Sequence, residues 1–355
     1  MEKKSFEDFN VLKTIGEGTY GKVYQVEDKN TKRIYAMKVL KKSHLLKKRA
    51  ITCTITEKDI LKQVRHPLII KLYSTFQTTE RVGFVMEYIN GGQLFYHMRK
   101  VCNFDEDTTR FYSAEIITAL EYLHSQHIIH RDLKPENILV NAQGHIVLTD
   151  FGLAKVDVTS DEGASTFCGT MEYMPPEMIK GEKYGKPADF WSVGILIYDM
   201  LYGQPPFRNN NRKKLQEMIL TKKIMFPSYW ARDTHSIIKE LTMRDPKQRP
   251  KIEQIKKHPF FKKINWNKIN KLETEAPFKP HIEKGLMDTS NIDPYYTDRA
   301  TALSPAGPIP QSQEDKFLNF TYVRSFSPSH VNNHISDVTA NGLPSPNPGG
   351  GTNPH

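Results

Sequence analysis

Apolar and aromatic residues in the first third of the chain come in short runs separated by turn residues. Such runs, bounded by Gly, Asn and Asp, are typical of strands. One segment has a different period, because Ile55, Ile60, Leu61 and Val64 fall on one face of a helix. We therefore predict a helix over residues 54–64 and strands over residues 9–15, 22–27, 34–40, 72–77 and 83–88.

After residue 92 the hydrophobic period changes to that of helices. In residues 107–124, Tyr112, Ile116, Leu120 and Leu123 recur at spacings of three and four, which predicts a long amphipathic helix. Helix-like segments dominate from there to residue 261. Strands followed by helices indicate an α+β fold, with a small β-rich lobe joined to a larger α-helical lobe.

The regular pattern fades beyond residue 261. Residues 277–310 carry scattered prolines, and a compact apolar cluster follows at residues 317–323. Residues 331–355 contain no Lys, Arg or aromatic residue, and this composition predicts disorder.

Composition excludes several classes of protein. The hydrophobic fraction of 38% supports a sizeable core, but no apolar stretch is long enough to span a bilayer. The first residues do not lead into the apolar segment of a secretory signal, so we expect no leader. Three scattered cysteines make neither a disulfide framework nor a zinc site, and His124, His127 and His145 lack metal-ligand spacing.

The formal net charge is +10, and residues 1–261 carry the whole excess. The densest basic runs, such as Arg212-Lys213-Lys214, have no interleaved aromatic residues and no recognised nucleic-acid module around them. A solvated basic face is therefore favoured over a nucleic-acid site, and we expect no nucleic-acid partner.

A glycine-rich motif lies near the start of the chain. Gly16-Glu17-Gly18-Thr19-Tyr20-Gly21-Lys22-Val23 is followed by a predicted strand, whereas a dinucleotide-binding fold would begin a helix there. This order favours a hairpin whose backbone N–H groups lie over phosphates. Lys38 lies in the next predicted strand and Glu57 lies on the predicted helix, so an ion pair aimed at phosphate oxygens is expected.

A more specific set of motifs follows in the second third. His130-Arg131-Asp132-Leu133-Lys134-Pro135-Glu136-Asn137 precedes Asp150-Phe151-Gly152, and Met174-Pro175-Pro176-Glu177 comes later. Together with the glycine motif, this ordered set is the signature of protein kinases, and residues 9–261 resemble a eukaryotic protein kinase domain. The resemblance implies a bilobal fold, ATP and Mg²⁺ as cofactors, and phosphoryl transfer to protein substrates.

The resemblance also implies the role of each residue. Asp132 would accept the substrate proton, Lys134 would neutralise the moving phosphoryl group, and Asn137 with Asp150 would hold Mg²⁺. Lys38, paired with Glu57, would hold the α- and β-phosphates. The full set implied to bind ATP comprises Ile15, Gly16, Glu17, Gly18, Thr19, Tyr20, Gly21, Lys22, Val23, Ala36, Lys38, Glu57, Met86 as gatekeeper, Glu87, Ile89 and Leu139. Glu177 would pair with Arg249, and Asp189 would belong to a structural helix.

The tail resembles that of the AGC group of serine/threonine kinases. Pro277-Phe278-Lys279-Pro280 is similar to the group's tether, and Phe317-x-x-Phe320-Thr321-Tyr322 is similar to its hydrophobic motif, which docks beside the Glu57 helix. The implied regulatory phosphosites are Thr166 in the activation loop, Ser304 in the turn motif and Thr321. The expected divisions are a short extension over 1–8, the kinase domain over 9–261, the regulatory tail over 262–330 and a low-complexity tail over 331–355.

Within the group, the closest resemblance is to the ribosomal protein S-six kinase subgroup. The resemblance implies basic Ser/Thr substrates, with Gln93, Glu136 and Asp199 at the substrate groove, and upstream kinases of the phosphoinositide-dependent and TOR types in growth or nutrient signalling. Gln93, Pro175 and Ile292 depart from the group's usual Glu, Ala and Phe. We expect a monomer in the cytoplasm, with the nucleus as the open alternative. The alternatives are a protein-kinase-B-like enzyme without its lipid-binding domain and, from another class, a scaffold pseudokinase.

Overall fold

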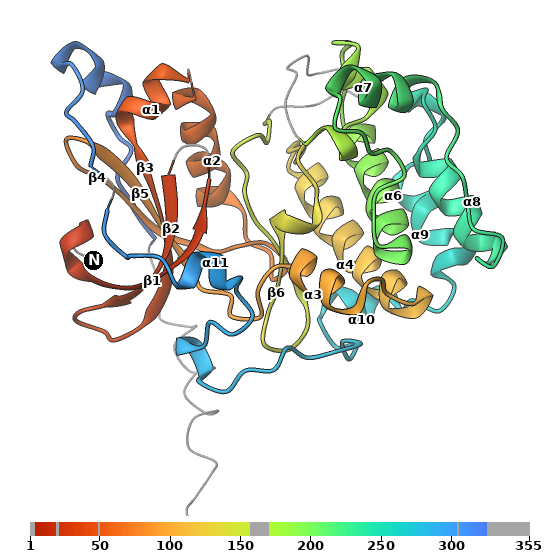
Figure 1. The fold of residues 1–355 in the computed structure, drawn as a ribbon, viewed down its shortest axis with the longest axis horizontal. Helices are drawn as coiled ribbons and strands as arrows, with labels where there is room; N and C mark the ends of the chain where they lie inside the picture. Colours follow the sequence, from red (N-terminus) through yellow and green to blue (C-terminus); the bar gives the residue numbers. More distant parts are fainter. Residues whose placement is uncertain (1–3, 19–20, 49, 157–169, 304, 325–355) are drawn as a thin grey trace, which may run out of the picture.

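The computed structural model describes residues 4–18, 21–48, 50–156, 170–303 and 305–324. A β-sheet lobe and a helical lobe lie side by side, and the C-terminal segment returns along both of them (Figure 1). This is the expected α+β arrangement. None of the helices among these residues has the length and apolar character needed to cross a membrane.

The small lobe is built on one antiparallel sheet with the order β1-β2-β3-β5-β4-β8. Its strands are β1 (Phe9–Glu17), β2 (Gly21–Asp28), β3 (Ile34–Lys41), β4 (Leu72–Gln77), β5 (Arg81–Glu87) and β8 (Tyr322–Val323). The five strands expected from the sequence are all present. The sixth, β8, comes from the tail and was not expected, because a two-residue strand leaves no periodic signal.

Successive strand residues face opposite sides of the sheet, which gives it two apolar faces. Phe84 and Met86 on the inner face join the main core, which continues into the helical lobe. Tyr24 and Val39 on the outer face belong to a separate core, against which Leu303 of the tail packs. Two helices, α1 (Lys42–Lys47) and α2 (Ile51–Gln63), complete the lobe. The sequence predicted α2, with its start three residues too late.

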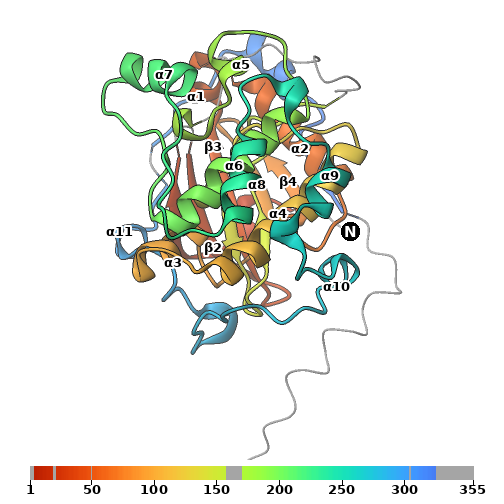
Figure 2. The ribbon, with the colours of Figure 1, turned by 90° about the vertical axis from the view of Figure 1, so that its right-hand side faces the viewer.

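The large lobe surrounds α6, in which residues 188–201 are buried. Figure 2 shows α4 and α8 beside this helix. The helices are α3 (Leu94–Val101), α4 (Glu106–Ser125), α5 (Pro176–Ile179), α6 (Pro187–Tyr202), α7 (Arg212–Thr221), α8 (Arg232–Leu241) and α9 (Ile252–Lys257). A two-stranded sheet, β6 (Ile138–Val140) and β7 (Ile146–Leu148), lies at the junction of the lobes; these three-residue strands were also missed.

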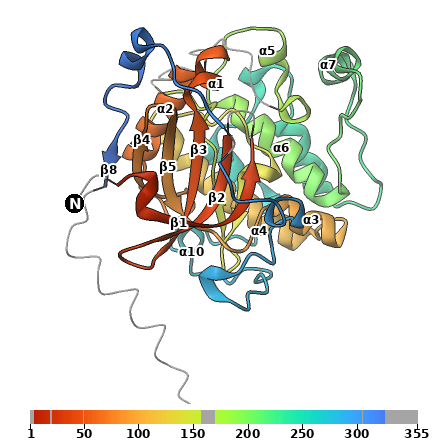
Figure 3. The same cartoon turned by 60° about the vertical axis from the view of Figure 1, so that its left-hand side comes forward.

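The tail wraps both lobes. It starts with α10 (Trp266–Asn270), passes α11 (Pro294–Thr297) and ends at β8, which is hydrogen-bonded to the free edge of β4 (Figure 3). Phe278 packs its ring against His97 and Tyr112 of the large lobe, as expected of the tether. The remaining short turns are 3-10 helices at Phe6–Asp8, Pro135–Asn137, Met171–Tyr173, Pro246–Gln248, Pro259–Phe261, Gly285–Met287 and Gln311–Phe317.

Candidate active site

Asp132 lies in the loop before β6, and its carboxylate is held from both sides. Asn137 donates from Nδ2 to Oδ2 at 2.9 Å, and the ammonium of Lys134 lies 3.0 Å from the same oxygen. The other oxygen, Oδ1, accepts from the backbone N–H of Thr170 at 3.0 Å. Lys134 also donates to the Thr170 hydroxyl at 2.8 Å. A carboxylate fixed in this way can accept a proton from a hydroxyl in one defined direction.

Lys38 of β3 forms the expected ion pair with Glu57 of α2. Its ammonium lies 2.7 and 3.0 Å from the two Glu57 oxygens and 3.2 Å from Oδ1 of Asp150. Burial alone would lower the pKa of Lys38, but Asp150 and Glu57 together raise it above its ordinary value. The same ammonium holds the pKa of Asp150 below its usual range. Both groups are therefore charged at neutral pH.

The oxygen atoms near Lys38 and Asp132 suit a divalent cation. Asp150 has a φ of 60°, an uncommon backbone conformation for a non-glycine residue and one that is found at functional sites. Its carboxylate and the Asn137 amide are hard oxygen ligands of the kind that Mg²⁺ prefers. The described residues contain no cluster of three or more His, Cys, Asp or Glu side chains that could hold a metal ion.

The glycine-rich motif forms the expected hairpin between β1 and β2. Glu17 lies opposite Lys22, and the N–H of Gly18 donates to the carbonyl of Gly21 at 2.8 Å. A Cβ on Gly21 would lie 1.9 Å from the carbonyl oxygen of Val39, so only glycine fits this close approach of the strands. Thr19 and Tyr20, at the tip, lie outside the described residues.

The expected adenine-binding residues lie on the inner face of the sheet and at the junction of the lobes. Val23 is opposite Lys38, and Ala36 is opposite Met86, so these four side chains share one face. The backbone N–H of Glu87 donates to the Lys71 carbonyl at 2.9 Å. Ile15 and Leu139 are half-buried, and Ile89 is 9% exposed.

Asp189 of α6 supports the loop that carries Asp132. Its carboxylate accepts from the backbone N–H groups of His130 and Arg131, and from the ring of His124 at 2.8 Å. These bonds hold Arg131 at a φ of 69°. Burial raises the pKa of Asp189, but these hydrogen bonds more than offset it and lower the pKa. His124 is thus a structural residue. The expected Glu177–Arg249 pair also forms, through two hydrogen bonds of 2.6 and 2.7 Å.

The hydrophobic motif docks on the small lobe. The rings of Phe317 and Phe320 are each 1% exposed, and Phe320 meets Phe84 edge to face. Lys58 of α2 donates to the Asn319 carbonyl at 3.1 Å, and Thr75 of β4 donates to the Phe320 carbonyl at 2.5 Å. Because α2 also carries Glu57, the tail supports the helix that pairs with Lys38.

The three residues expected at the substrate groove have different environments. Gln93 is exposed at the start of α3, whereas Asp199 is only 3% exposed and accepts from the Tyr173 hydroxyl at 2.5 Å. Burial raises the pKa of Asp199 to about 6; the Tyr173 bond opposes this rise and the charge of Glu136 adds to it. Oε2 of Glu136 is buried with no hydrogen-bond partner among the described residues. Asp199 is thus less accessible than the sequence suggested.

Two functional contacts could not be read from the motifs. Thr170 orients Asp132 across 38 residues, and Tyr173 orients Asp199 across 26. The only sequence signal for Thr170 is its place in the loop motif. Two of the expected phosphosites, Thr166 and Ser304, lie outside the described residues, and Thr321 is half-buried.

Comparison with known proteins agrees with this geometry. Residues 9–261 match the protein kinase domain, and residues 284–322 match the protein kinase C terminal domain. The chain therefore belongs to the protein kinase family.

Three similar proteins indicate which group of protein kinases the chain belongs to. A probable serine/threonine-protein kinase of Dictyostelium discoideum is 45% identical over 323 residues, which cover 90% of this chain and 71% of the relative. A RAC family serine/threonine-protein kinase homolog of the same organism is 44% identical over 329 residues, which cover 91% and 73%. The Arabidopsis thaliana kinase AtPK2/AtPK19 is 44% identical over 324 residues, which cover 90% and 68%. The protein is a serine/threonine kinase of the AGC group, and its domain implies the use of ATP and a divalent metal.

Proposed function

We propose that this kinase transfers the γ-phosphate of Mg²⁺-bound ATP to serine or threonine hydroxyls of basic proteins. The observation that carries the proposal is the position of Asp132, whose two oxygens are held by Asn137, Lys134 and Thr170. Asp132 would accept the hydroxyl proton while Lys134 balances the charge that develops on the phosphoryl group. The bound cation would supply charge neutralisation between the phosphates, with Asp150 and Asn137 as its protein ligands.

The preference for basic substrates rests on Glu136 and Asp199. The charge of Glu136 helps to raise the pKa of Asp199, and Oε2 of Glu136 is buried without a hydrogen-bond donor among the described residues. A buried acceptor without a donor is costly, and a substrate guanidinium would relieve that cost with a charge-assisted bond. Gln93 carries no charge and would contribute a hydrogen bond only.

Activation is proposed to require phosphate on Thr321 and then on Thr166, from TOR-type and phosphoinositide-dependent-type kinases. Docking of Phe317 and Phe320 supports the first step, because it ties the tail to the helix of Glu57. The guanidinium of Arg131 supports the second: it is half-buried among carbonyls and donates to Tyr184 at 2.8 Å, and an anion there would gain charge-assisted bonds.

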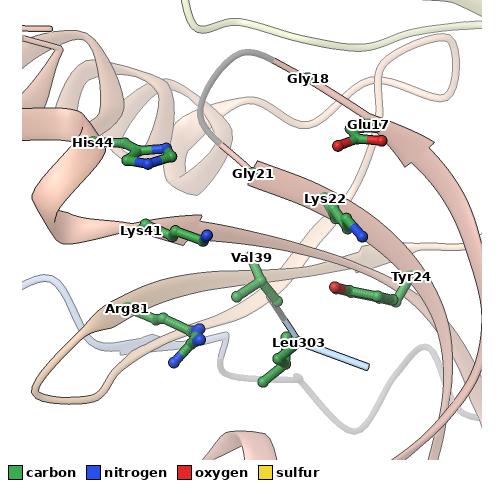
Figure 4. Close-up of a pocket in the computed structure, with 10 residues that line it drawn as sticks. All are labelled: Glu17, Gly18, Gly21, Lys22, Tyr24, Val39, Lys41, His44, Arg81 and Leu303. Atoms are coloured by element: carbon green, nitrogen blue, oxygen red, sulfur yellow. The ribbon is translucent and has the colours of Figure 1, made fainter. Parts of the chain in front are cut away.

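A basic cavity on the outer face of the small lobe supports a phosphate on Ser304. Four basic residues line it, Lys22, Lys41, His44 and Arg81, together with the carboxylate of Glu17 and with Leu303, the residue before Ser304 (Figure 4). Cations gathered at the point where the tail crosses this face would bind a phosphoserine. The cavity is remote from Lys38, because Lys41 is three residues along β3 and faces the other side of the sheet.

Membership of the ribosomal protein S-six kinase subgroup is also a proposal. The relatives include RAC-type kinases at nearly the same identity as the others, so protein-kinase-B-like specificity is the second candidate. Peptide-library phosphorylation by the activated protein would test both the acidic groove and the subgroup. A selected Arg before the acceptor Ser or Thr, reduced in Glu136→Gln, supports the groove; selection of Arg unchanged in that variant contradicts it.

A further inference from the structure

Exposed apolar side chains gather at one corner of the large lobe. Among the described residues, the large apolar side chains that are exposed divide into two groups of four, and one group lies on the tail. The other group, which we call the apolar corner, is between 45% and 79% exposed and consists of Val101, Tyr202, Met225 and Tyr229. Single apolar residues scattered over a surface need no explanation, whereas a contiguous group marks a binding surface.

The first half of the apolar corner is held together by the loop between α3 and α4. Asn103, two residues after Val101, donates from its side-chain amide to the carbonyl of Leu201 at 3.1 Å. Leu201 is the residue before Tyr202, so this bond ties the end of α3 to the end of α6. Figure 3 shows the end of α6 beside α3.

The second half comes from the loop between α7 and α8. The Tyr198 hydroxyl of α6 donates to the Met225 carbonyl at 3.0 Å and fixes this loop against the helix. The ring of Trp230, which is buried, has its centre 6.4 Å from that of Tyr202 and 6.5 Å from that of Tyr229. The loop and the end of α6 therefore form one continuous surface over a buried aromatic base.

The charge around the apolar corner is positive. Four exposed cations follow or precede its residues closely in the chain, and none of them has a carboxylate within ion-pair distance among the described residues: Lys100, Lys222, Lys223 and Arg232. The carboxylates nearby are already engaged, because Glu106 accepts from the start of α8, Asp233 pairs with Lys262, and Asp105 caps α4. Two copies of this surface would repel each other, whereas an acidic segment is attracted.

The apolar corner continues from the proposed substrate groove along two helices. Gln93 precedes α3 and Val101 ends it, so the eight residues of this helix, about 12 Å in length, join the groove to the corner. Asp199 lies one turn of α6 before Tyr202. A substrate bound in the groove therefore reaches the corner with roughly four further residues of extended chain.

We propose that the apolar corner is a docking surface for an acidic segment of the protein substrates, whose apolar side chains contact Tyr202, Met225 and Tyr229. Aromatic residues and methionine are enriched at the centres of protein interfaces. The surrounding cations attract the carboxylates of the segment and speed its association. This inference deepens the proposed function and rests on it, because it gives the same substrates a second contact outside the groove.

The first test measures binding and does not depend on catalysis. Random peptide segments displayed on phage are selected on the full chain, without nucleotide and without an acceptor sequence. Met225→Ser/Tyr229→Ser removes apolar surface, and Lys222→Glu/Lys223→Glu reverses the charge beside it. Leu286→Ser is the matched control, because Leu286 is an exposed apolar residue of the tail.

We expect the selected segments to be rich in Asp, Glu and large apolar residues. Their binding should fall about tenfold or more in both double variants, as for the loss of one buried apolar side chain, and stay unchanged in Leu286→Ser. Segments without acidic residues, or binding unchanged in the double variants, would overturn the proposal. A single-stranded oligonucleotide that binds more tightly than the segments, and loses binding in the same variants, would also overturn it.

The second test joins a selected segment to the Arg-containing acceptor peptide by a flexible linker. In the parent we expect the KM of the joined substrate to be about tenfold lower than that of the peptide alone, because linkage raises the effective concentration. Met225→Ser/Tyr229→Ser should lose this advantage and keep the kcat and KM of the peptide alone. Equal KM values for the two substrates in the parent would contradict the proposal. If the parent phosphorylates neither substrate, the proposed function is refuted, while the binding test still decides whether the surface binds acidic segments.

Discussion

Lys38 and Glu57 form an ion pair of 2.7 Å between a strand and a helix of the small lobe, although 19 residues separate them in the chain. The strand fixes one partner through its ladder to β2 and β5. The helix that carries Glu57 is positioned in part by the tail, through the bond from Lys58 to the Asn319 carbonyl. Catalytic geometry in this protein therefore depends on residues near both ends of the described chain.

The first prediction concerns Lys38 itself. Lys38→Met removes the cation that faces both Glu57 and Asp150, and we expect kcat to fall by about 10²–10³-fold, as for the loss of a preorganised electrostatic group. Glu57→Gln should lower kcat less, because Asp150 still holds the ammonium. Steady-state phosphotransfer measures both effects, and equal loss in the two variants would contradict the role of Asp150.

The second prediction tests the docked tail. Phe320→Ala removes a ring that is 1% exposed, and we expect a loss of about 3–5 kcal/mol in local stability, typical of buried Phe→Ala changes. Amide exchange in α2 should quicken and kcat should fall. Leu318→Ala is the control, because that side chain is 66% exposed. If the two variants behave alike, docking does not support the helix.

The third prediction follows from the raised pKa of Asp199, which is about 6. Below pH 6 this carboxyl is protonated, so the KM for an Arg-containing peptide should rise as the pH falls from 7.5 to 5.5. Fold stability should change in the opposite direction to substrate binding. Because the pKa of Asp199 is higher in the folded state than in the unfolded state, its contribution to stability increases as the pH falls. A peptide without basic residues serves as the control, and equal KM profiles for both peptides would contradict this account.

The fourth prediction concerns the scaffold. Glu177 and Arg249 have side chains that are 1% and 0% exposed, and removal of one partner leaves a buried charge unpaired. Glu177→Gln should lower the free energy of unfolding by about 3–5 kcal/mol. Lys262→Gln breaks an exposed pair and should change it by about 1 kcal/mol or less. Thermal unfolding of the two variants measures both effects. Similar melting temperatures for Glu177→Gln and Lys262→Gln would contradict the proposed stabilising role of the buried pair.

Local pattern predicted the strands of the small lobe because each has turn residues at its ends, and motif spacing predicted the Lys38–Glu57 pair. The pattern failed where elements are too short to repeat a period, as in β6 and β8. It also failed for contacts between distant segments. Thr170 contacts Asp132, and Arg299 contacts Glu17, only after the chain has folded. No sequence motif relates either residue to its partner, so the sequence does not predict these contacts.

The departure at Ile292 shows the same limit. The sequence shows only that Ile292 replaces the usual Phe, whereas the structure shows that Arg299, seven residues later, forms an ion pair with Glu17 of β1. A single substitution in the sequence indicates that one contact is lost. It does not show which contacts the neighbouring residues make instead.

The most direct test of the central claim is phosphate transfer from labelled ATP with Mg²⁺ to an Arg-rich serine peptide, after treatment with an upstream kinase. Asp132→Asn, which keeps the size of the side chain but replaces one acceptor oxygen with an NH2 group and removes the basic carboxylate, is the comparison. We predict transfer by the parent and a decrease of about 10²–10⁴-fold in the variant, the usual contribution of a general base, with ATP binding unchanged. Equal transfer by both proteins would contradict the role given to Asp132, and absence of transfer by an activated, ATP-bound parent would contradict the proposed function.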